Sequence, residues 1–165
     1  MSLGTTIQTY DETADLRQCW QTPVALFDKL HSVLRFTVDA CASPHNALLP
    51  RYWTAEQDCT KQNWSGERVF CNPPFGNTAA ILANVKAAEM ACFLFPSSSM
   101  TTKYRGKNVP DYIAMPDHRI KFVPPSSVIK AVSPSLGTFL CLYGITQDEA
   151  DKLKTVLNYD IYKLL

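Results

Sequence analysis

The sequence lacks a long apolar run, and its first residues hold no stretch like the apolar segment of a secretory signal peptide. We therefore expect a cytoplasmic protein that does not contact a membrane. Charge of one sign is also not in excess, because 16 Lys and Arg residues stand against 15 Asp and Glu residues, for a net charge of +1. No global field favours nucleic acid or membrane, so a polyanion would need a local basic patch.

Closely spaced cysteine pairs are absent as well. The six cysteines include no CxxC pair, and the three histidines do not cluster near them. That spacing is unlike a zinc site, so no metal is expected. Cys41, Cys71, Cys92 and Cys141 lie inside apolar runs. They are predicted to be buried free thiols of a cytosolic protein.

The sequence does have the composition of an ordinary globular domain, with 165 residues, 46% of them hydrophobic and 19% charged. This length fits one domain with a sizeable core. We predict a single domain over residues 1–165, in which residues 1–19 form a polar N-terminal arm.

Short apolar runs alternate with helical patterns along the chain. Strands are predicted at 36–39, 68–72, 92–96, 119–123 and 137–144, and helices at 21–35, 77–91 and 146–159. Helix caps are predicted at Thr22, with Pro23 as the first helical residue, and in a capping box of Thr146 and Glu149. Apolar strands separated by helices predict an α/β fold with a mostly parallel sheet and flanking helices.

Asn72-Pro73-Pro74-Phe75 follows directly on an apolar strand. In an open α/β sheet, ligands bind at the carboxyl ends of the strands, where Asp39 and Pro96 would join Asn72. Proline has no N–H, so this segment offers two acceptors, the Asn72 side-chain oxygen and the Pro73 carbonyl, without competing donors. Two acceptors suit an amine with two N–H groups, and Phe75 offers a flat face for a ring. The pattern indicates methyl transfer to an amine or amide nitrogen; the alternative is a stiff turn with a core phenylalanine.

Several motifs occur in order around this segment: Trp20-Gln21-Thr22-Pro23, Asp39-Ala40-Cys41-Ala42-Ser43, Pro50-Arg51-Tyr52-Trp53-Thr54 and Cys71-Asn72-Pro73-Pro74. Together they resemble the phage and prophage DNA N-6-adenine methyltransferases, the Dam-like family, over roughly residues 18 to 143. Thr102-Lys103-Tyr104 and Arg119-Ile120-Lys121-Phe122 are weaker matches to the same family.

The resemblance implies a Rossmann-like methyltransferase sheet and an adenine-specific DNA methyltransferase. Such an enzyme moves a methyl group from S-adenosylmethionine to adenine N6 in double-stranded DNA after flipping the base out. It would be phage- or prophage-encoded, act in the bacterial cytoplasm and serve restriction-modification or its evasion. The catalytic residues implied are Asn72, Pro73, Pro74 and Phe75. The cofactor-binding residues implied are Trp20, Thr22, Pro23, Asp39, Ala40, Cys41, Ala42, Asp58 and Asn63.

For the DNA, the resemblance and the residue types together suggest Phe75, Lys103, Tyr104, Arg105, Lys107, Arg119 and Phe122. Cations with an interleaved aromatic residue suit a phosphate backbone. Structural alternatives remain open: a solvated loop at 101–107, an inward-facing Phe122, a helix cap at Thr22 and a hydrogen-bonded structural role for Asp39. Trp64 is expected in the core.

Two features depart from the family pattern: no glycine follows the first strand, and Asn63 stands where the family has Asp. No separate target-recognition domain is visible, which predicts low specificity or modest affinity. A monomer or weak homodimer is expected. Two alternative functions remain: a prophage remnant that binds the cofactor or DNA without catalysis, and an amino-methyltransferase acting on RNA or protein glutamine. Cys71 adjoins the motif but is predicted to be buried by the strand and not to be a nucleophile.

Overall fold

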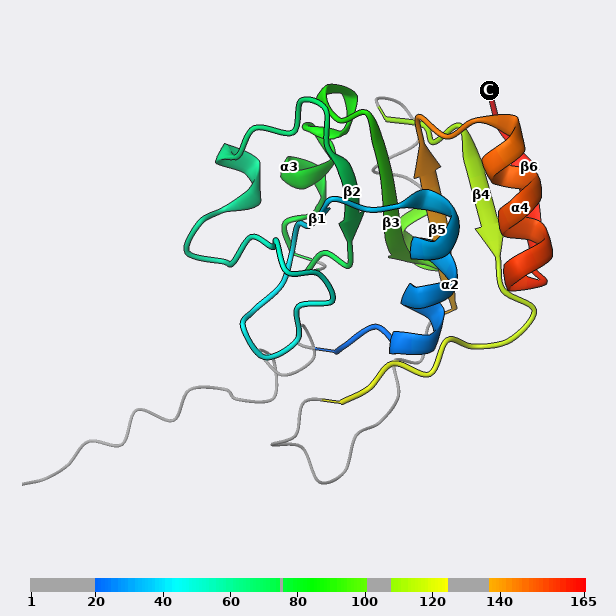
Figure 1. The fold of residues 1–165 in the computed structure, drawn as a ribbon, viewed down its shortest axis with the longest axis horizontal. Coiled ribbons are helices and arrows are strands. Elements are labelled where there is room, and N and C mark those ends of the chain that lie inside the picture. Colours follow the sequence, from blue (N-terminus) through cyan, green and yellow to red (C-terminus); the bar gives the residue numbers. More distant parts are fainter. Residues whose placement is uncertain (1–19, 75, 101–107, 125–136) are drawn as a thin grey trace, which may run out of the picture.

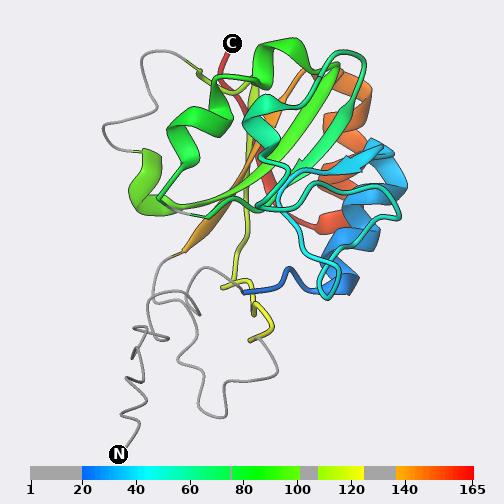
Figure 2. The same ribbon diagram turned by 90° about the vertical axis from the view of Figure 1, so that its left-hand side faces the viewer.

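A six-stranded sheet forms the centre of the computed structural model, which describes residues 20–74, 76–100, 108–124 and 137–165. The strands are β1 (Val38–Asp39), β2 (Arg68–Cys71), β3 (Met90–Pro96), β4 (Tyr112–Met115), β5 (Thr138–Tyr143) and β6 (Asp160–Lys163), in the order β1-β2-β3-β5-β4-β6. Helices α2 (Val24–Leu34) and α4 (Gln147–Leu157) lie on one face of the sheet, and α3 (Thr78–Leu82) lies on the other (Figures 1 and 2). Short 3₁₀ turns are η1 (Cys59–Lys61), η2 (Val85–Ala87) and η3 (Ser97–Met100).

Strand β3 divides the core into two parts. All of its residues are buried, and successive side chains of a strand point to opposite faces. Met90, Cys92 and Leu94 therefore join the core under α2 and α4, whereas Ala91, Phe93 and Phe95 join the core on the α3 side. Both faces of the sheet are thus covered, which is why β3 reads as a continuous apolar run.

The prediction of an α/β fold is confirmed, but the prediction of a mostly parallel sheet is wrong for the described strands. β1, β2 and β3 are parallel neighbours, whereas the β3–β5, β5–β4 and β4–β6 pairs are antiparallel. Parallel neighbours require a crossover that carries the chain back to the end of the sheet at which the first strand began. In the pair of β4 and β5, Ala114 near the end of one strand lies opposite Leu140 near the start of the next, so these two strands run in opposite directions.

The predicted strand at 119–123 is wrong too. Within it only Val123 makes a sheet-like contact, an isolated bridge to Gln21. Ile120 is buried and Phe122 packs against the core under α2 and α4. The apolar residues of this segment therefore pack against the core without joining the sheet. The sheet contains β4 instead, and neither β4 nor β6 is among the strands predicted from the sequence.

Each of the three predicted helical regions contains a helix, but the helix ends differ from the prediction. α4 begins with the predicted capping box, in which the Thr146 hydroxyl accepts from Glu149 N–H and the Glu149 carboxylate accepts from Thr146 N–H. Pro23, not Thr22, occupies the cap position of α2. The alanine-rich helix predicted at 77–91 contracts to α3 and η2, because Met90 and Ala91 already belong to β3.

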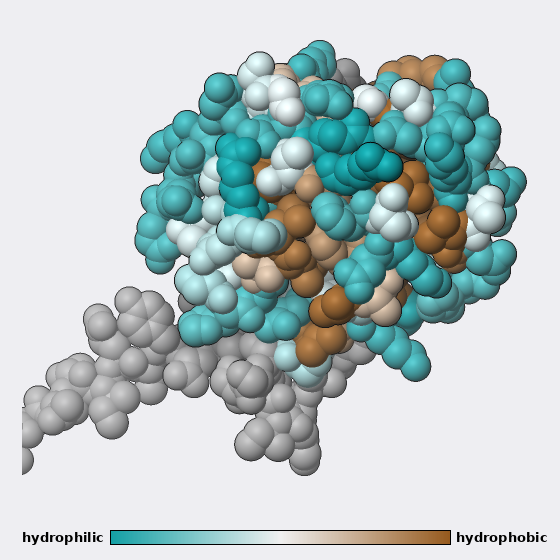
Figure 3. Space-filling model, in the orientation of Figure 1, coloured by the Kyte–Doolittle hydropathy of each residue, from teal (hydrophilic) through white to brown (hydrophobic). Residues whose placement is uncertain are grey.

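The surface is mainly hydrophilic at the rim of the face that carries α2 and α4, while apolar residues reach the surface in its middle (Figure 3). In the described part of the chain, no helix has both the length and the apolar character needed to cross a membrane.

Candidate active site

The carboxyl ends of β1 and β2 lie side by side, at the lower edge of the sheet in Figure 1. Asp39 pairs with Phe70, and the N–H of Ala40 donates to the Phe70 carbonyl across 2.9 Å. One residue further, the Cys71 thiol donates to Cys41 Sγ across 3.4 Å. The sequence prediction that Asp39 and Asn72 share one edge of the sheet is therefore confirmed.

Asn72 directly follows the last residue of β2 and is half-buried, and a hydrogen bond orients its side chain. Its Nδ2 donates to the main-chain oxygen of Trp20 across 3.1 Å. Among the described residues, nothing donates to Asn72 Oδ1 or to the Pro73 carbonyl. The Pro74 carbonyl is occupied instead, since it accepts from Asn77 N–H at 3.2 Å and from the Thr78 hydroxyl at 3.3 Å. Two acceptors thus remain open at the end of β2, the same pair that the sequence suggested.

Asp39 is a buried carboxylate at the end of β1, with 3% of its surface exposed. Leu48 N–H donates to its Oδ2 across 3.2 Å, and no cation of the described chain forms an ion pair with it. Burial raises the pKa of this carboxyl to about 6, opposed only by hydrogen bonds from the main chain at Leu48 and Cys41. A carboxylate with so little compensation is suited to bind a positively charged ligand group.

The segment that follows β1 is held against it by main-chain hydrogen bonds that sequence reasoning missed. Asp39 N–H donates to the Arg51 carbonyl at 3.1 Å, and Trp53 N–H donates to the Asp39 carbonyl at 2.9 Å. Ala42 N–H then donates to the Trp53 carbonyl at 3.1 Å. The signal in the sequence that could have predicted this pairing is the high strand propensity of Tyr52 and Trp53. This segment therefore extends the sheet edge beside the candidate cofactor residues Ala40, Cys41 and Ala42.

Three thiols meet beside Asp39. Cys41 Sγ lies 3.4 Å from Cys71 Sγ and 3.8 Å from Cys59 Sγ. Cys71, Cys92 and Cys141 are buried, as predicted from the sequence. Cys41 was also predicted to be buried but is only half-buried. Burial raises the pKa of the Cys71 thiol, so it carries no charge at neutral pH. In the part of the chain that the structure describes, no cluster of His, Cys, Asp and Glu is arranged to hold a metal ion.

Asp58 and Asn63, the residues suggested for the cofactor's ribose and adenine, use their oxygens locally. Asp58 Oδ1 accepts from the N–H and the hydroxyl of Thr60, and Oδ2 lies 3.2 Å from Lys61 Nζ. Asn63 Oδ1 accepts from Ser65 N–H at 3.0 Å. Asp58 directly precedes Cys59, which contacts Cys41. Asp58 and Asn63 each shape their own turn, and their roles in cofactor binding stay predictions. Trp64 is a core residue as predicted, and its Nε1 donates to the Cys59 carbonyl.

The chain before α2 lies against the segment that ends at Val123. Gln21 N–H donates to the Val123 carbonyl at 2.8 Å, and Val123 N–H donates back to the Gln21 carbonyl at 2.9 Å. This bridge brings Thr22, which is buried, close to the predicted substrate residue Phe122, which is half-buried. Arg119 is exposed. The other predicted substrate residues, Phe75, Lys103, Tyr104, Arg105 and Lys107, lie outside the described residues.

An open hollow of about 450 Å³ lies at the other end of the strands, lined by Lys86, Asn108, Asp111 and Tyr143 among others. Tyr143 pairs with Ala91 near the start of β3, far along the strands from Asn72. None of the residues singled out from the sequence lines this hollow.

Comparison with known proteins decides the family. The family model described as DNA N-6-adenine-methyltransferase (Dam) matches residues 8–161. The chain belongs to the Dam family. Among its relatives is the "DNA N-6-adenine-methyltransferase" of Haemophilus phage HP1 (strain HP1c1), which is 30% identical over 63 residues. That match covers 37% of this Dam-family chain and 36% of the relative, so it spans only about a third of the relative's length.

Proposed function

We propose that this Dam-family protein transfers a methyl group from S-adenosylmethionine to adenine N6 in double-stranded DNA. The observation that carries the proposal is the pair of open acceptors, Asn72 Oδ1 and the Pro73 carbonyl, at the end of β2. They fit the two N–H groups of an exocyclic amine. Membership of the Dam family supports the choice of adenine in DNA over other amines.

The residues at the end of β1 fit the amino-acid part of S-adenosylmethionine. Asp39 is a buried carboxylate without a cationic partner among the described residues, which suits an ammonium group. Ala40 and Ala42 follow it, and their small side chains let a ligand approach the main chain. Because Cys41 touches Cys71, a ligand on this segment lies next to the Asn72 motif. When bound, the cofactor supplies an electrophilic methyl group on its sulfonium.

In this mechanism Asn72 and Pro73 accept the two N–H bonds of the target amine and hold its nitrogen in one position. The lone pair of that nitrogen would then attack the methyl carbon while the bond from this carbon to the sulfonium sulfur breaks. This direct displacement would release S-adenosylhomocysteine, and one N–H proton of the methylated amine would pass to solvent. Positioning and preorganised dipoles account for catalysis, with no covalent enzyme intermediate. Because adenine N6 is paired inside a duplex, the base has to be flipped out before it reaches Asn72. Phe75 is proposed to stack on the flipped base, and Arg119 and the basic residues of 101–107 to contact phosphates.

The test is incubation of the protein with S-adenosylmethionine labelled in its methyl group and, separately, with duplex DNA, RNA or protein. We expect label in DNA only. Label in RNA or protein instead of DNA would show that the substrate is that polymer and not adenine in DNA. Cofactor binding without label in any polymer would show a binding protein without catalysis and overturn the proposal.

A further inference from the structure

The amide of Asn72 has only one orientation that suits its surroundings. Its neighbour, the Trp20 main-chain oxygen, is an acceptor and has no hydrogen to give. The amide nitrogen therefore has to face Trp20, where Nδ2 donates across 3.1 Å. Oδ1 lies on the other branch of the amide and turns away from Trp20, to where the described residues place no donor.

The Trp20 oxygen is itself held in place by the residues that follow it. Gln21 exchanges two main-chain hydrogen bonds with Val123, at 2.8 and 2.9 Å. The Pro23 carbonyl accepts from the N–H groups of Leu26 and Phe27 in the first turn of α2. Trp20 is therefore joined to a helix and to a neighbouring segment, and its carbonyl offers Asn72 a fixed partner.

We propose that the Trp20 carbonyl is a positioning group that turns Asn72 Oδ1 toward the target amine, so that this position requires an amide and not a carboxylate. The proposal rests on the methyl transfer proposed above. Each half of the amide has its own task, since the nitrogen donates to the protein and the oxygen accepts from the substrate. A carboxylate also accepts from an amine, yet it has no hydrogen for Trp20. Its oxygen would be repelled there, and the side chain would rotate out of position.

The test is Asn72→Asp, whose kcat on duplex DNA is compared with that of the wild type from pH 5.5 to pH 8. At pH 8 the carboxylate should lower kcat by about 10-fold or more, with little change in cofactor binding. A protonated carboxyl has the shape of the amide, with an O–H for Trp20 and a carbonyl for the amine. The ratio of Asn72→Asp to wild-type kcat should therefore rise several-fold toward pH 5.5. Burial raises the pKa of Asp39 to about 6, so this group titrates in the same range, and each variant is therefore compared with the wild type at the same pH.

Two further variants separate this role from a general structural one. Asn72→Ala lacks both tasks, so its kcat ratio should stay near background at every pH. Asn84 also donates through Nδ2 to a main-chain oxygen, that of Ala80 at 3.3 Å, but it lies in the turn after α3. Asn84→Asp should keep wild-type activity, with a ratio that does not change with pH.

A readout independent of activity is the free energy of unfolding. The loss of stability caused by Asn72→Asp should shrink as pH falls, because protonation restores a donor for Trp20. Wild-type activity of Asn72→Asp at pH 8, or a pH-independent loss of both activity and stability, would overturn the role of Trp20. If the wild type itself formed no N6-methyladenine, the proposed function would fail instead, and the unfolding data would still decide the Trp20 contact.

Discussion

At the scale of a single residue, Asp39 connects the proposed cofactor site to the stability of the protein. Burial raises the pKa of its carboxyl from 3.8 to about 6. The folded protein therefore holds this proton more tightly than the unfolded chain, and the resulting stabilisation, complete below pH 3.8, is lost as pH rises through about 6. Above pH 6 the ionised carboxylate lowers stability unless a positive ligand group accompanies it.

We predict that Asp39→Asn is more stable than the wild type at pH 7, by about 1–3 kcal/mol, and that this difference disappears near pH 4. The same change should weaken S-adenosylmethionine binding at pH 8, because the partner of the ammonium is gone. Chemical denaturation at several pH values and calorimetric titration measure the two effects. The control is Asp28→Asn, which changes an exposed carboxylate of α2 that has no proposed role in cofactor binding. An equal pH dependence in Asp39→Asn and wild type would contradict the account.

Cys71 makes a second prediction at this scale. Its thiol is fully buried and burial raises its pKa, so it is a poor nucleophile despite adjoining Asn72. Cys71→Ala should keep methyl transfer at nearly the wild-type kcat and lose about 1–2 kcal/mol of stability to the small cavity. Cys92→Ala, at a buried thiol in β3, is the matched control for the cavity. Loss of turnover in Cys71→Ala, with fold and cofactor binding intact, would show that the thiol takes part in the reaction.

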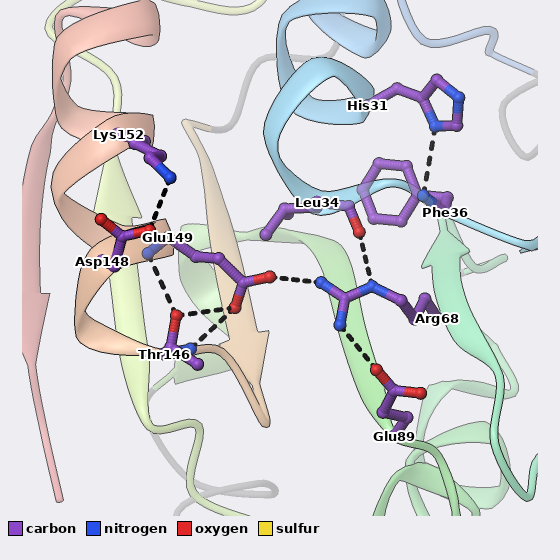
Figure 4. A network of polar contacts seen from close by, with 9 residues as sticks. All are labelled: His31, Leu34, Phe36, Arg68, Glu89, Thr146, Asp148, Glu149 and Lys152. Carbon is purple, nitrogen blue, oxygen red and sulfur yellow. Dashed lines mark hydrogen bonds and ion pairs between the residues drawn. The ribbon is translucent and has the colours of Figure 1, made fainter.

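At the scale of elements, Arg68 connects β2 to its surroundings at the end opposite Asn72 (Figure 4). Its Nε donates to the Leu34 carbonyl at the end of α2, and its guanidinium pairs with Glu89 at 2.8 Å and with Glu149 in α4. Partial burial opposes the charge of Glu149, but Thr146 N–H and Arg68 hold the pKa of its carboxyl below the usual value. Arg68 thus joins β2, α2 and α4.

We predict that Arg68→Ala lowers the free energy of unfolding by about 1–3 kcal/mol, because it removes the side-chain donor to the Leu34 carbonyl and the cation beside the partly buried Glu149. Lys152→Ala is the control. Lys152 also pairs with an acidic residue of α4, Asp148 at 2.6 Å, but both side chains are exposed. Its removal should change stability by about 0.5 kcal/mol or less. Denaturant unfolding compares the two, and equal losses would show that Arg68 is only a surface charge.

The elements also show what the sequence predicts well and what it does not. α2, α4, β2 and β3 were identified because their periodicity and caps are local signals. The segment at 119–123 carries the same alternation as a strand, but it is used for packing beside Gln21. β4 and β6 depend on pairing with distant partners, and their short runs look like loop in isolation. The open acceptors at Asn72 and Pro73 were predictable from residue chemistry, whereas the Trp20 contact, 52 residues away, was not.

At the scale of the whole molecule, the proposed chemistry gathers at one edge of the mixed sheet. The parallel strands β1 and β2 bring Asp39 and Asn72 to this edge, and the bridge between Gln21 and Val123 lies beside it. The antiparallel strands extend the sheet on the other side of β3. With a net charge of +1, the protein has no global attraction for DNA, so affinity is expected to be modest and to depend on local cations.

The measurement that tests the central claim most directly uses duplex DNA and S-adenosylmethionine, with the wild type and Asn72→Ala side by side. The DNA is digested to nucleosides and N6-methyldeoxyadenosine is quantified, while cofactor binding is measured on the same preparations. We predict that the wild type forms this nucleoside and that Asn72→Ala forms almost none while binding the cofactor nearly as well. Full activity in Asn72→Ala, or no N6-methyladenine from the wild type, would contradict the account.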